Sequence, residues 1–276
     1  MARRRLDAEL VRRGLARSRE HARDLIDAGL VKVRGTVAAK AATQVEEADS
    51  IAVDAGQSAE KYVSRGAHKL IGALDRFPGV TVHAKLCLDA GASTGGFTQV
   101  LLERGAARVL AVDVGYGQLA WPVRTDPRVD VLERTNVRSL TPADVPFRPE
   151  LIVADLSFIP LELVLPALSA VATDTCDMVL MVKPQFEVGR AAVGDGVVRE
   201  PVLRESAVAG VAREAHSQGL GVIDVVASPL PGPSGNVEYF LWLARSDGRM
   251  GTTAGECLVN GDLAEAITRA VKEGPQ

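Results

Sequence analysis

Most of the chain after residue 85 alternates between short apolar runs and longer mixed stretches. Each run stops at a glycine, a proline or an ionisable residue, which is typical of a strand buried on both faces of a sheet. The pattern predicts seven strands, at residues 86–89, 108–113, 129–133, 151–154, 178–182, 221–227 and 237–243. Because helical stretches separate most of them, we expect an α/β fold in which helices cover both faces of a mainly parallel sheet.

The last two predicted strands are joined by a loop that contains Pro229, Pro231 and Pro233. Proline has no N–H to donate to a ladder, so this loop interrupts the strand pairing. Strands joined by so short a connection pair as an antiparallel hairpin. We therefore expect a Rossmann-like, seven-stranded sheet that is mainly parallel and has an antiparallel last strand.

The first part of the chain shows a different pattern, in which short helical periods are followed by alternation. The apolar spacing predicts helices at residues 6–13 and 18–28, each ended by a glycine, with Ser18 as the N-cap of the second helix. Residues 31–35 then alternate apolar with basic side chains, as a half-exposed strand does. These features predict a small α+β domain that folds apart from the large sheet.

A polar stretch near Gly56 separates the two patterns. We place the first domain at residues 1–58, a linker at residues 59–63 and the second domain at residues 64–276. Ser64 precedes a run with apolar residues at helical spacing, so we expect Ser64 to cap a helix there.

Composition limits the class of protein. The chain has 276 residues, of which 47% are hydrophobic, so it can bury a proper core. It contains no apolar run long enough to span a membrane and no signal-peptide pattern at its start. Cys87, Cys176 and Cys257 have neither disulfide nor zinc spacing. We expect a cytoplasmic protein with free thiols and no bound metal.

The charge is distributed unevenly along the chain. Residues 1–40 contain eleven Arg or Lys and five Asp or Glu, whereas the rest of the chain contains 21 and 30. A basic segment attached to an acidic body suggests that one end contacts a polyanion, by a mechanism that depends strongly on salt.

A glycine-rich turn follows the first predicted strand of the second domain, in the sequence Asp89-Ala-Gly-Ala-Ser-Thr-Gly-Gly-Phe97. Glycine lets a ligand approach the backbone N–H groups, and the following helix points its positive end at the same place. The next strand ends at Asp113, where a carboxylate in a doubly wound sheet reaches a ribose diol. The glycine spacing is not that of a dinucleotide fold, and the core of the turn has no arginine for phosphates. S-adenosylmethionine is therefore the expected cofactor.

Ionisable residues stand at three of the predicted strand ends. Asp155 and Lys183 each follow a buried strand, and Glu238 lies where the last strand starts. The working residues of an open parallel sheet gather at this edge, so the three are candidates for catalysis. Each by itself is equally well explained as a surface charge, and Lys69 by itself as a lysine with its stem on an apolar helix face.

The first domain resembles a known RNA-binding fold. The motifs Arg5-Leu-Asp, Ser18-Arg and Ala28-Gly-Leu-Val-Lys-Val, with Gly35, are similar to those of ribosomal protein S-four, pseudouridine synthases and tyrosyl-tRNA synthetases. The resemblance implies that these residues face RNA: Arg3, Arg4, Arg5, Arg17, Arg19 and Lys40. A basic face of this kind can neutralise phosphates, although a solvated helix face has a similar composition.

The second domain resembles the ribose 2'-O-methyltransferases of the FtsJ type, and blocks along nearly the whole chain resemble the TlyA family of ribosomal RNA cytidine methyltransferases. The blocks include Ser-Arg-Gly-Ala-His-Lys69, Ala-Asp155-Leu-Ser-Phe-Ile, Val-Lys183-Pro-Gln-Phe-Glu and Pro-Ser-Gly-Asn-Val-Glu238. The linker departs from the family pattern, with Glu60 and Tyr62 in place of an arginine and a tryptophan, which puts a coupling role of the linker in doubt.

The resemblance implies the roles of particular residues. The catalytic set would be Lys69, Asp155, Lys183 and Glu238. The residues implied for S-adenosylmethionine are Gly91, Ser93, Gly95, Gly96, Phe97, Asp113, Val114 and Asn136. Lys183 would deprotonate or polarise the ribose 2'-hydroxyl, aided by burial and by neighbouring Lys69, while the carboxylates orient the two lysines.

We therefore expect 2'-O-methylation of cytidine in ribosomal RNA of the small subunit, the large subunit or both, with an effect on susceptibility to capreomycin and viomycin that the family implies. Two alternatives stay open. The family has also been described as haemolysins, although the sequence shows no membrane-active helix. The chain could also be an RNA-binding protein without catalysis, which the four candidate catalytic residues argue against.

Overall fold

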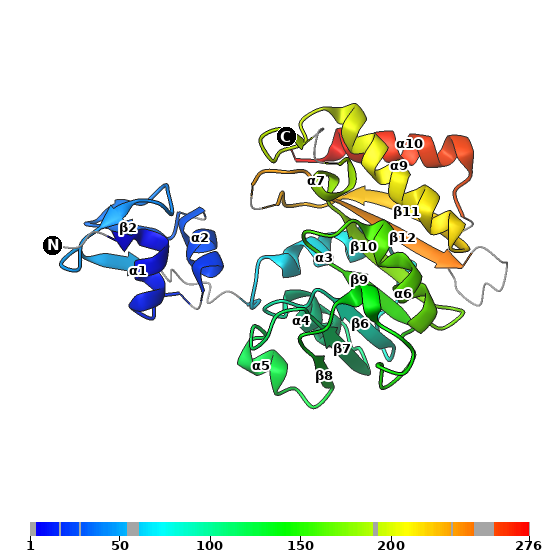
Figure 1. The fold of residues 1–276 in the computed structure, drawn as a ribbon, viewed down its shortest axis with the longest axis horizontal. Helices are drawn as coiled ribbons and strands as arrows, with labels where there is room; N and C mark the ends of the chain where they lie inside the picture. Colours follow the sequence, from blue (N-terminus) through cyan, green and yellow to red (C-terminus); the bar gives the residue numbers. More distant parts are fainter. Residues whose placement is uncertain are drawn as a thin grey trace. The chain divides into compact units, whose positions relative to one another are not determined.

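The structure is a computed structural model that describes residues 4–16, 18–27, 29–53, 61–189, 193–232, 234–245 and 257–275. Arg3, Arg17 and Glu60 lie outside these residues. The chain forms two compact units, Met1–Lys61 and Tyr62–Gln276 (Figure 1).

The N-terminal unit consists of two helices and short antiparallel strands. Its helices are α1 (Leu6–Arg12) and α2 (Arg19–Asp27). Strand β1 (Arg4–Arg5) pairs with β4 (Gln44–Val45), and β2 (Val31–Val33) lies between β3 (Thr36–Val37) and β5 (Ile51–Val53). The Ser18 hydroxyl accepts the N–H of His21 at 3.1 Å, which confirms the predicted cap. Apolar side chains that include Leu6, Leu10 and Ile26 form its core.

The larger unit contains the seven predicted strands, with ends that coincide with the predicted ones or differ from them by at most two residues. They are β6 (Leu86–Ala90), β7 (Arg108–Val112), β8 (Val129–Leu132), β9 (Leu151–Ala154), β10 (Asp177–Val182), β11 (Leu220–Ala227) and β12 (Tyr239–Arg245). Their order in the sheet is β11-β12-β10-β9-β6-β7-β8. Strand β12 is antiparallel to both β11 and β10, whereas the pairs from β10 to β8 are parallel, so the predicted fold class is confirmed.

Helices cover both faces of this sheet. One face packs on α3 (Gly66–Arg76) and α4 (Gly96–Glu103), and the other on α6 (Leu165–Val171), α9 (Pro201–Ser217) and α10 (Asn260–Glu273). The short helices are α5 (Trp121–Arg124), α7 (Pro184–Glu187), η1 (Val137–Ser139) and η2 (Leu161–Leu163). Because both faces are covered, the strands are apolar on both sides, and this is why their sequences read as continuous apolar runs.

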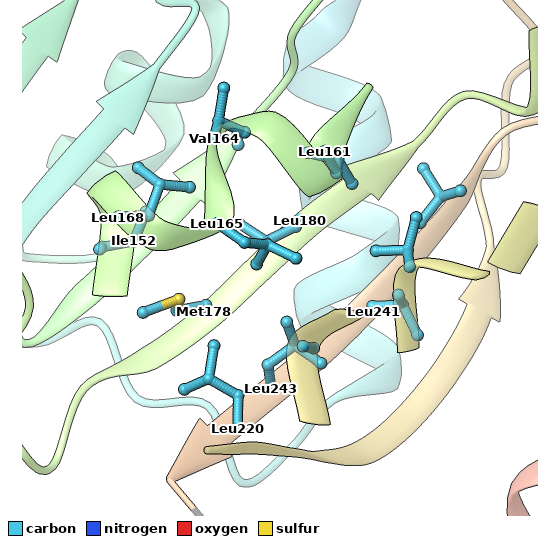
Figure 2. Packing of buried hydrophobic residues seen from close by; sticks show 14 of the residues in the cluster. Ile152, Leu161, Val164, Leu165, Leu168, Met178, Leu180, Leu220, Leu241 and Leu243 are labelled. Carbon is cyan, nitrogen blue, oxygen red and sulfur yellow. The ribbon is translucent and has the colours of Figure 1, made fainter. Parts of the chain in front are cut away.

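Strand β10 illustrates this double burial. Met178 and Leu180 point to the cluster under α6 and α9, together with Leu241 and Leu243 of β12 (Figure 2). The intervening residue Val179 faces the cluster on the α3 side. Successive side chains of a strand point to opposite faces, so each strand contributes to both clusters.

The predicted cap at Ser64 is wrong. Helix α3 begins at Gly66, after Arg65, without a capping side chain, and the Ser64 carbonyl rather than its hydroxyl accepts the N–H of Ala67. The Ser64 hydroxyl is directed at Gly96, where an added Cβ would lie 2.2 Å from it. The hydroxyl therefore packs against the first residue of α4 and makes no capping hydrogen bond to α3.

Candidate active site

The candidate site lies where the order of the strands reverses. The chain runs outward from β6 to β7 and β8 and then returns to β9 on the other side of β6. In open α/β sheets, ligands bind beyond the carboxyl ends of the strands at such a switch point. The turn after β6 and the residues after β9 and β10 meet at this edge.

Lys183 and Asp155 form an ion pair at the ends of two neighbouring strands. The Nζ of Lys183, directly after β10, lies 2.6 Å from Oδ1 of Asp155, directly after β9. Lys183 also donates to the Ser157 hydroxyl at 2.9 Å. The Asp155 side chain is 23% exposed and that of Lys183 is 10% exposed, so the pair is open to a substrate from one side.

Lys69 and Glu238 form a second and more deeply buried pair. The Nζ of Lys69, on α3, donates to Oε2 of Glu238 at 2.5 Å, and the two side chains are 5% and 1% exposed. The loop before β12 closes over this pair at Gly232, where an added Cβ would lie 2.6 Å from Oε1 of Glu238. Glycine is thus needed at position 232 for the loop to approach so closely.

The register of the sheet brings the two pairs together. Val182 of β10 lies opposite Tyr239 of antiparallel β12, so the next residues out, Lys183 and Glu238, face each other at the end of the ladder. Asp155 lies at the same edge, because Leu180 is paired with Ala154. All four predicted catalytic residues therefore gather at one edge, in an arrangement with one carboxylate for each lysine.

The predicted glycine turn passes beside Asp155. Gly91 has a φ of +85°, and a Cβ there would lie 2.5 Å from the Asp155 carbonyl oxygen. Gly95 has a φ of +99°, and a Cβ there would meet Leu119 at 2.9 Å. A side chain at either position would disturb the turn, so both positions require glycine.

Asp113 organises the loop on the other side of the turn. Its carboxylate accepts the N–H of Ser93 at 2.8 Å and that of Gly115 at 2.6 Å. A small hollow lies beside it, lined in part by Ala92, Gln118 and Leu119. The hollow is far smaller than the roughly 300–1,000 Å³ of most ligand sites, so a complete cofactor requires side chains at the rim to move.

The other predicted cofactor residues differ in their burial and in their contacts. The Phe97 ring is buried against Phe240, with 6.2 Å between ring centroids, so the ring supports the turn from within the core. Val114 is 72% exposed. The side-chain oxygen of Asn136 accepts the N–H of Arg138 at 3.0 Å, and Asn136 lies next to Thr135, whose N–H bonds the Asp113 carbonyl.

Asp89 places a carboxyl group beneath the turn. Thr98 donates to its Oδ2 at 2.6 Å, whereas Oδ1 is buried without a hydrogen-bond partner. Burial raises the pKa of Asp89 to about 7. The glycine cradle, the Asp113 carboxylate and the unpartnered Asp89 oxygen together fit a cofactor that has hydroxyl and ammonium donors, as S-adenosylmethionine has. The described part of the chain holds no cluster of His, Cys, Asp and Glu suited to a metal ion.

The sequence analysis assigned no role to several residues of the site. Ser157 bonds Lys183, and Phe158 is 91% exposed with a φ of +65° and packs against Phe186 at 5.3 Å. Glu187 accepts the N–H of Leu161 at 3.0 Å and so links the segments that follow β9 and β10. Burial raises the pKa of Glu187 to about 7. The signal in the sequence that could have identified them is their position within the motifs around Asp155 and Lys183.

The N-terminal unit exposes all four of the predicted RNA-binding residues that the structure describes. Arg4, Arg5, Arg19 and Lys40 all reach the surface. Arg5 and Arg19 share the carboxylate of Asp7, and Arg4 lies 3.7 Å from Glu9. These arginines are therefore held by buried acids and are not independent solvated charges.

Comparison with known proteins gives consistent results for both units. Residues 62–245 match the FtsJ-like methyltransferase family, and residues 4–51 match the S4 domain. The chain is 57% identical, over the full length of both proteins, to the 16S/23S rRNA (cytidine-2'-O)-methyltransferase TlyA of Mycobacterium tuberculosis. It is 35% identical to the 23S rRNA (cytidine-2'-O)-methyltransferase TlyA of Campylobacter jejuni, over 68% of this chain and 72% of that protein.

A solved structure from Streptococcus thermophilus, described as a hemolysin, is also similar. It has a TM-score of 0.75 and 36% identity, and the match covers 99% of this chain and 97% of that one. Among the helices that the structure describes, none has the length and apolarity needed to cross a bilayer.

Proposed function

We propose the reaction of this protein from the premise that the chain belongs to the FtsJ-like methyltransferase family and, within it, to the TlyA rRNA (cytidine-2'-O)-methyltransferases. In this proposal the protein transfers a methyl group from S-adenosylmethionine to the ribose 2'-oxygen of a cytidine in ribosomal RNA. The substrate is RNA of the small subunit, the large subunit or both, and the protein acts in the cytoplasm, where ribosomes are assembled.

The observation that carries the proposal is the pair of lysine–carboxylate contacts at the switch point, beside the glycine turn. S-adenosylmethionine supplies an electrophilic methyl group when it is bound. Lys183, the more exposed lysine of the two, would hold the 2'-hydroxyl. As the ammonium paired with Asp155 it would polarise the hydroxyl, and only after losing its own proton to solvent, as the neutral amine, would it receive the hydroxyl proton. Asp155 orients Lys183, and the buried Lys69–Glu238 pair fixes the start of β12 against α3. Holding the reacting groups in place in this way supplies much of the rate.

Residues of the turn would bind the cofactor mainly through their backbone. Gly91, Ser93, Gly95 and Gly96 would surround the methionine part, and Asp113 would accept hydrogen bonds from the ribose hydroxyls. Val114 and Asn136 would lie near the adenine. Asp89 offers a buried acceptor to the ammonium group of the methionine part.

The RNA would approach through two kinds of contact. Exposed Phe158, three residues after Asp155, offers a ring on which an unstacked base can stack. The arginines of the S4 domain would contact phosphates, which position the RNA without reading its sequence. By analogy with the family, we propose that the modification affects susceptibility to capreomycin and viomycin.

The test is methyl transfer to purified ribosomal subunits. The full chain is incubated with unmodified 30S and 50S subunits and S-adenosylmethionine carrying a labelled methyl group, and the rRNAs are mapped by mass spectrometry. We expect label on a cytidine ribose of at least one rRNA and its suppression by excess S-adenosylhomocysteine. Label on a base or on protein, or no label on either subunit, would contradict the proposal.

A further inference from the structure

Asp7, at the start of α1, is a buried carboxylate surrounded by arginines. Its side chain is fully buried and accepts Nε and Nη2 of Arg5, both at 3.1 Å, and Nη2 of Arg19 at 2.9 Å. The Nε of Arg23 lies 3.7 Å from the same carboxylate. The side chains of the three arginines are 44%, 54% and 56% exposed. Asp7 thus joins three half-exposed guanidinium groups at one point.

The local structure explains why the carboxylate stays there and stays charged. Asp7 lies in the first turn of α1, where its Oδ1 also accepts the N–H of Ala8 at 2.9 Å. A negative charge is favourable at the N-terminus of a helix. Hydrogen bonds from Arg5, together with those from Arg19, lower the pKa of Asp7 to about 2 in spite of burial.

Arg23 belongs to this group through helix geometry. It lies four residues after Arg19 on α2, and residues at this spacing are neighbours on one helix face. The motifs that indicated Arg5 and Arg19 do not include Arg23, and it is identified only by its contact with Asp7. Three arginines and one aspartate leave a surplus of positive charge on an exposed face.

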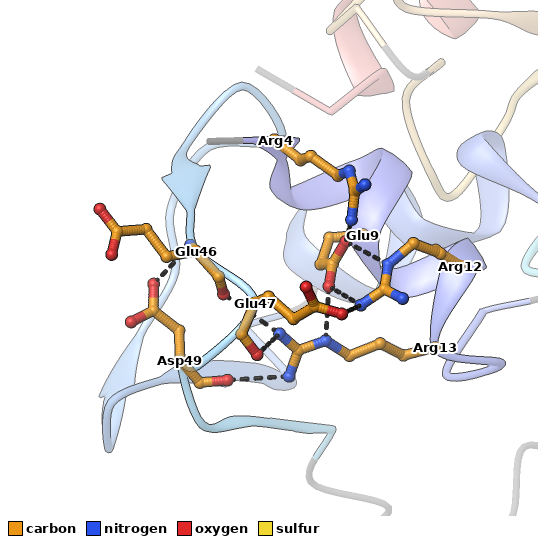
Figure 3. Close-up of polar contacts among 7 residues, drawn as sticks. All are labelled: Arg4, Glu9, Arg12, Arg13, Glu46, Glu47 and Asp49. Atoms are coloured by element: carbon orange, nitrogen blue, oxygen red, sulfur yellow. Dashed lines mark hydrogen bonds and ion pairs between the residues drawn. The ribbon is translucent and has the colours of Figure 1, made fainter. Parts of the chain in front are cut away.

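A second cluster, around Glu9, contains one arginine whose contacts are mainly internal (Figure 3). Arg13 donates to Glu9 and to the backbone carbonyls of Glu46, Glu47 and Asp49, and its side chain is only 20% exposed. These bonds tie α1 to the turn between β4 and β5. The arginines at Asp7 make their described bonds to the carboxylate alone, and their outer surfaces face solvent.

We propose that Asp7 is a positioning residue that holds Arg5, Arg19 and Arg23 as a single phosphate-binding surface for ribosomal RNA, in which Arg23 is a further contact residue. The proposal rests on the proposed function, because it takes rRNA as the ligand. Guanidinium groups held with a fixed orientation bind phosphate oxygens with less loss of side-chain entropy than free arginines.

The first test uses the direction in which one substitution changes the affinity for RNA. Asp7→Asn removes a negative charge from the RNA-facing side, so charge alone predicts tighter binding of RNA. If Asp7 acts by positioning, the affinity falls instead, by about fivefold or more, because the arginines lose their common anchor. Affinity is measured with the full chain and in-vitro-transcribed 16S and 23S rRNA over a series of KCl concentrations. Unchanged or tighter binding by Asp7→Asn overturns the positioning role.

The second test concerns Arg23 and is independent of any effect of Asp7 on folding. Arg23→Gln is expected to weaken binding by about fivefold and to reduce the slope of log affinity against log salt by about one. Arg34→Gln is the control for charge and exposure, because Arg34 is 64% exposed and is paired with a different carboxylate, that of Asp49, at 2.7 and 2.8 Å. Equal effects of the two substitutions would show that Arg23 contributes only general charge and would overturn its role as a contact residue.

Folding and function are checked separately. Amide NMR signals of α1 in each variant report whether the N-terminal unit is intact. If Asp7→Asn unfolds this unit, the comparison of Arg23→Gln with Arg34→Gln still decides whether the arginine surface exists. If the unsubstituted chain binds neither rRNA, the proposed function itself fails. If it binds and the variants do not follow the expected order, only this inference fails.

Discussion

The two units of this protein bury carboxylates next to cations in opposite ways. In the N-terminal unit, Asp7 and Glu9 are each contacted by three arginines, most of which are about half exposed. In the methyltransferase unit, Glu238 and Asp155 each have one lysine, and the Lys69–Glu238 pair is almost completely buried. The first arrangement has an excess of positive charge at the surface, whereas the second is balanced and its cations are more deeply buried.

The difference follows from what each unit has to contact. A polyanion is attracted by surplus positive charge at the surface, and arginine keeps its charge under all ordinary conditions. A site that handles one proton benefits from a lysine in a defined position with a defined partner. Under the proposed function, carboxylates therefore hold arginines for docking in one unit and lysines for chemistry in the other.

The largest expected effect tests the role of Lys183 in the Lys183–Asp155 pair. We expect Lys183→Ala to reduce the single-turnover rate of methyl transfer by about 100-fold or more, because general acid–base groups contribute about 10²–10⁴. Affinities for cofactor and rRNA should stay within about twofold. Lys85→Ala is the matched control, since Lys85 makes a similar pair with Asp177 at 2.8 Å at the opposite end of β10. A variant that binds normally and transfers methyl at the normal rate would remove Lys183 from the mechanism.

The next effect compares the stability contributions of the two arrangements. Glu238→Gln leaves Lys69 as a buried charge without its ionised partner, which costs about 3–5 kcal/mol of unfolding free energy. Asp7→Asn releases arginines that already contact water, so we expect a smaller loss, about 1–2 kcal/mol. Denaturant titration of the full chain, with amide signals from each unit as the probe, measures both. The double variant with Lys69→Met and Glu238→Gln should regain part of the loss, and equal losses for Glu238→Gln and Asp7→Asn would break the comparison.

The third prediction concerns a raised pKa in the methyltransferase unit. The pKa of Glu187 is raised to about 7 by burial, so between about pH 4.5 and 7 the folded protein binds more protons there than the unfolded chain does. The contribution of this group to stability is therefore highest below about pH 4.5 and falls as the pH rises to about 7. Glu187→Gln should remove this component. The difference in free energy of unfolding between this variant and the unsubstituted chain should therefore be about 1–2 kcal/mol more favourable to the variant at pH 8 than at pH 5.

The control for this prediction is Glu265→Gln, which removes an exposed carboxylate from α10 that does not contribute to the raised pKa of Glu187. Denaturant midpoints of the two variants and the unsubstituted chain, measured at both pH values, give the comparison. The same pH dependence in Glu187→Gln as in the unsubstituted chain would show that Glu187 does not titrate in this range.

The smallest expected effect is a pH dependence of the stability of the N-terminal unit. Its direction is opposite to that expected for Glu187. Hydrogen bonds from arginines lower the pKa values of Asp7 and Glu9 to about 2, so their contribution is complete above about pH 4.5 and is lost as the pH falls to about 2. We expect Asp7→Asn and Glu9→Gln to flatten the acid unfolding of α1, followed by its amide NMR signals. Asp27→Asn, at an exposed position of α2, should leave the acid midpoint unchanged. An acid midpoint that none of these variants alters would assign the transition to other groups.

Local sequence patterns predicted the elements of the fold well. Each strand of the large sheet is buried on both faces, so its sequence is a continuous apolar run that stops at a polar residue. Asp155 and Lys183 stand at two of these stops and Glu238 just before the antiparallel last strand. They could therefore be identified as candidates, since the carboxyl ends of parallel strands and the amino end of an antiparallel strand lie at one edge of the sheet. The glycine turn was equally visible, because a positive φ at Gly91 and Gly95 excludes most other residues.

The partners of these residues depend on contacts between distant parts of the chain. Lys69 and Glu238 are 169 positions apart, and only the register of β10 with β12 and the packing of α3 place them together. The same holds for Ser64, whose hydroxyl turned to Gly96 instead of capping α3, and for Phe97, whose ring is in the core. Propensity and periodicity carry no information about such contacts.

For this protein, the amino-acid sequence alone determined the strands, the glycine turn and the kinds of residue at the sheet edge, because burial and backbone conformation restrict residue type locally. The tertiary structure decided which lysine meets which carboxylate and that Arg5, Arg19 and Arg23 share Asp7. Ion pairing acts through space between side chains, and the chain path that brings them together is set by the packing of the whole unit.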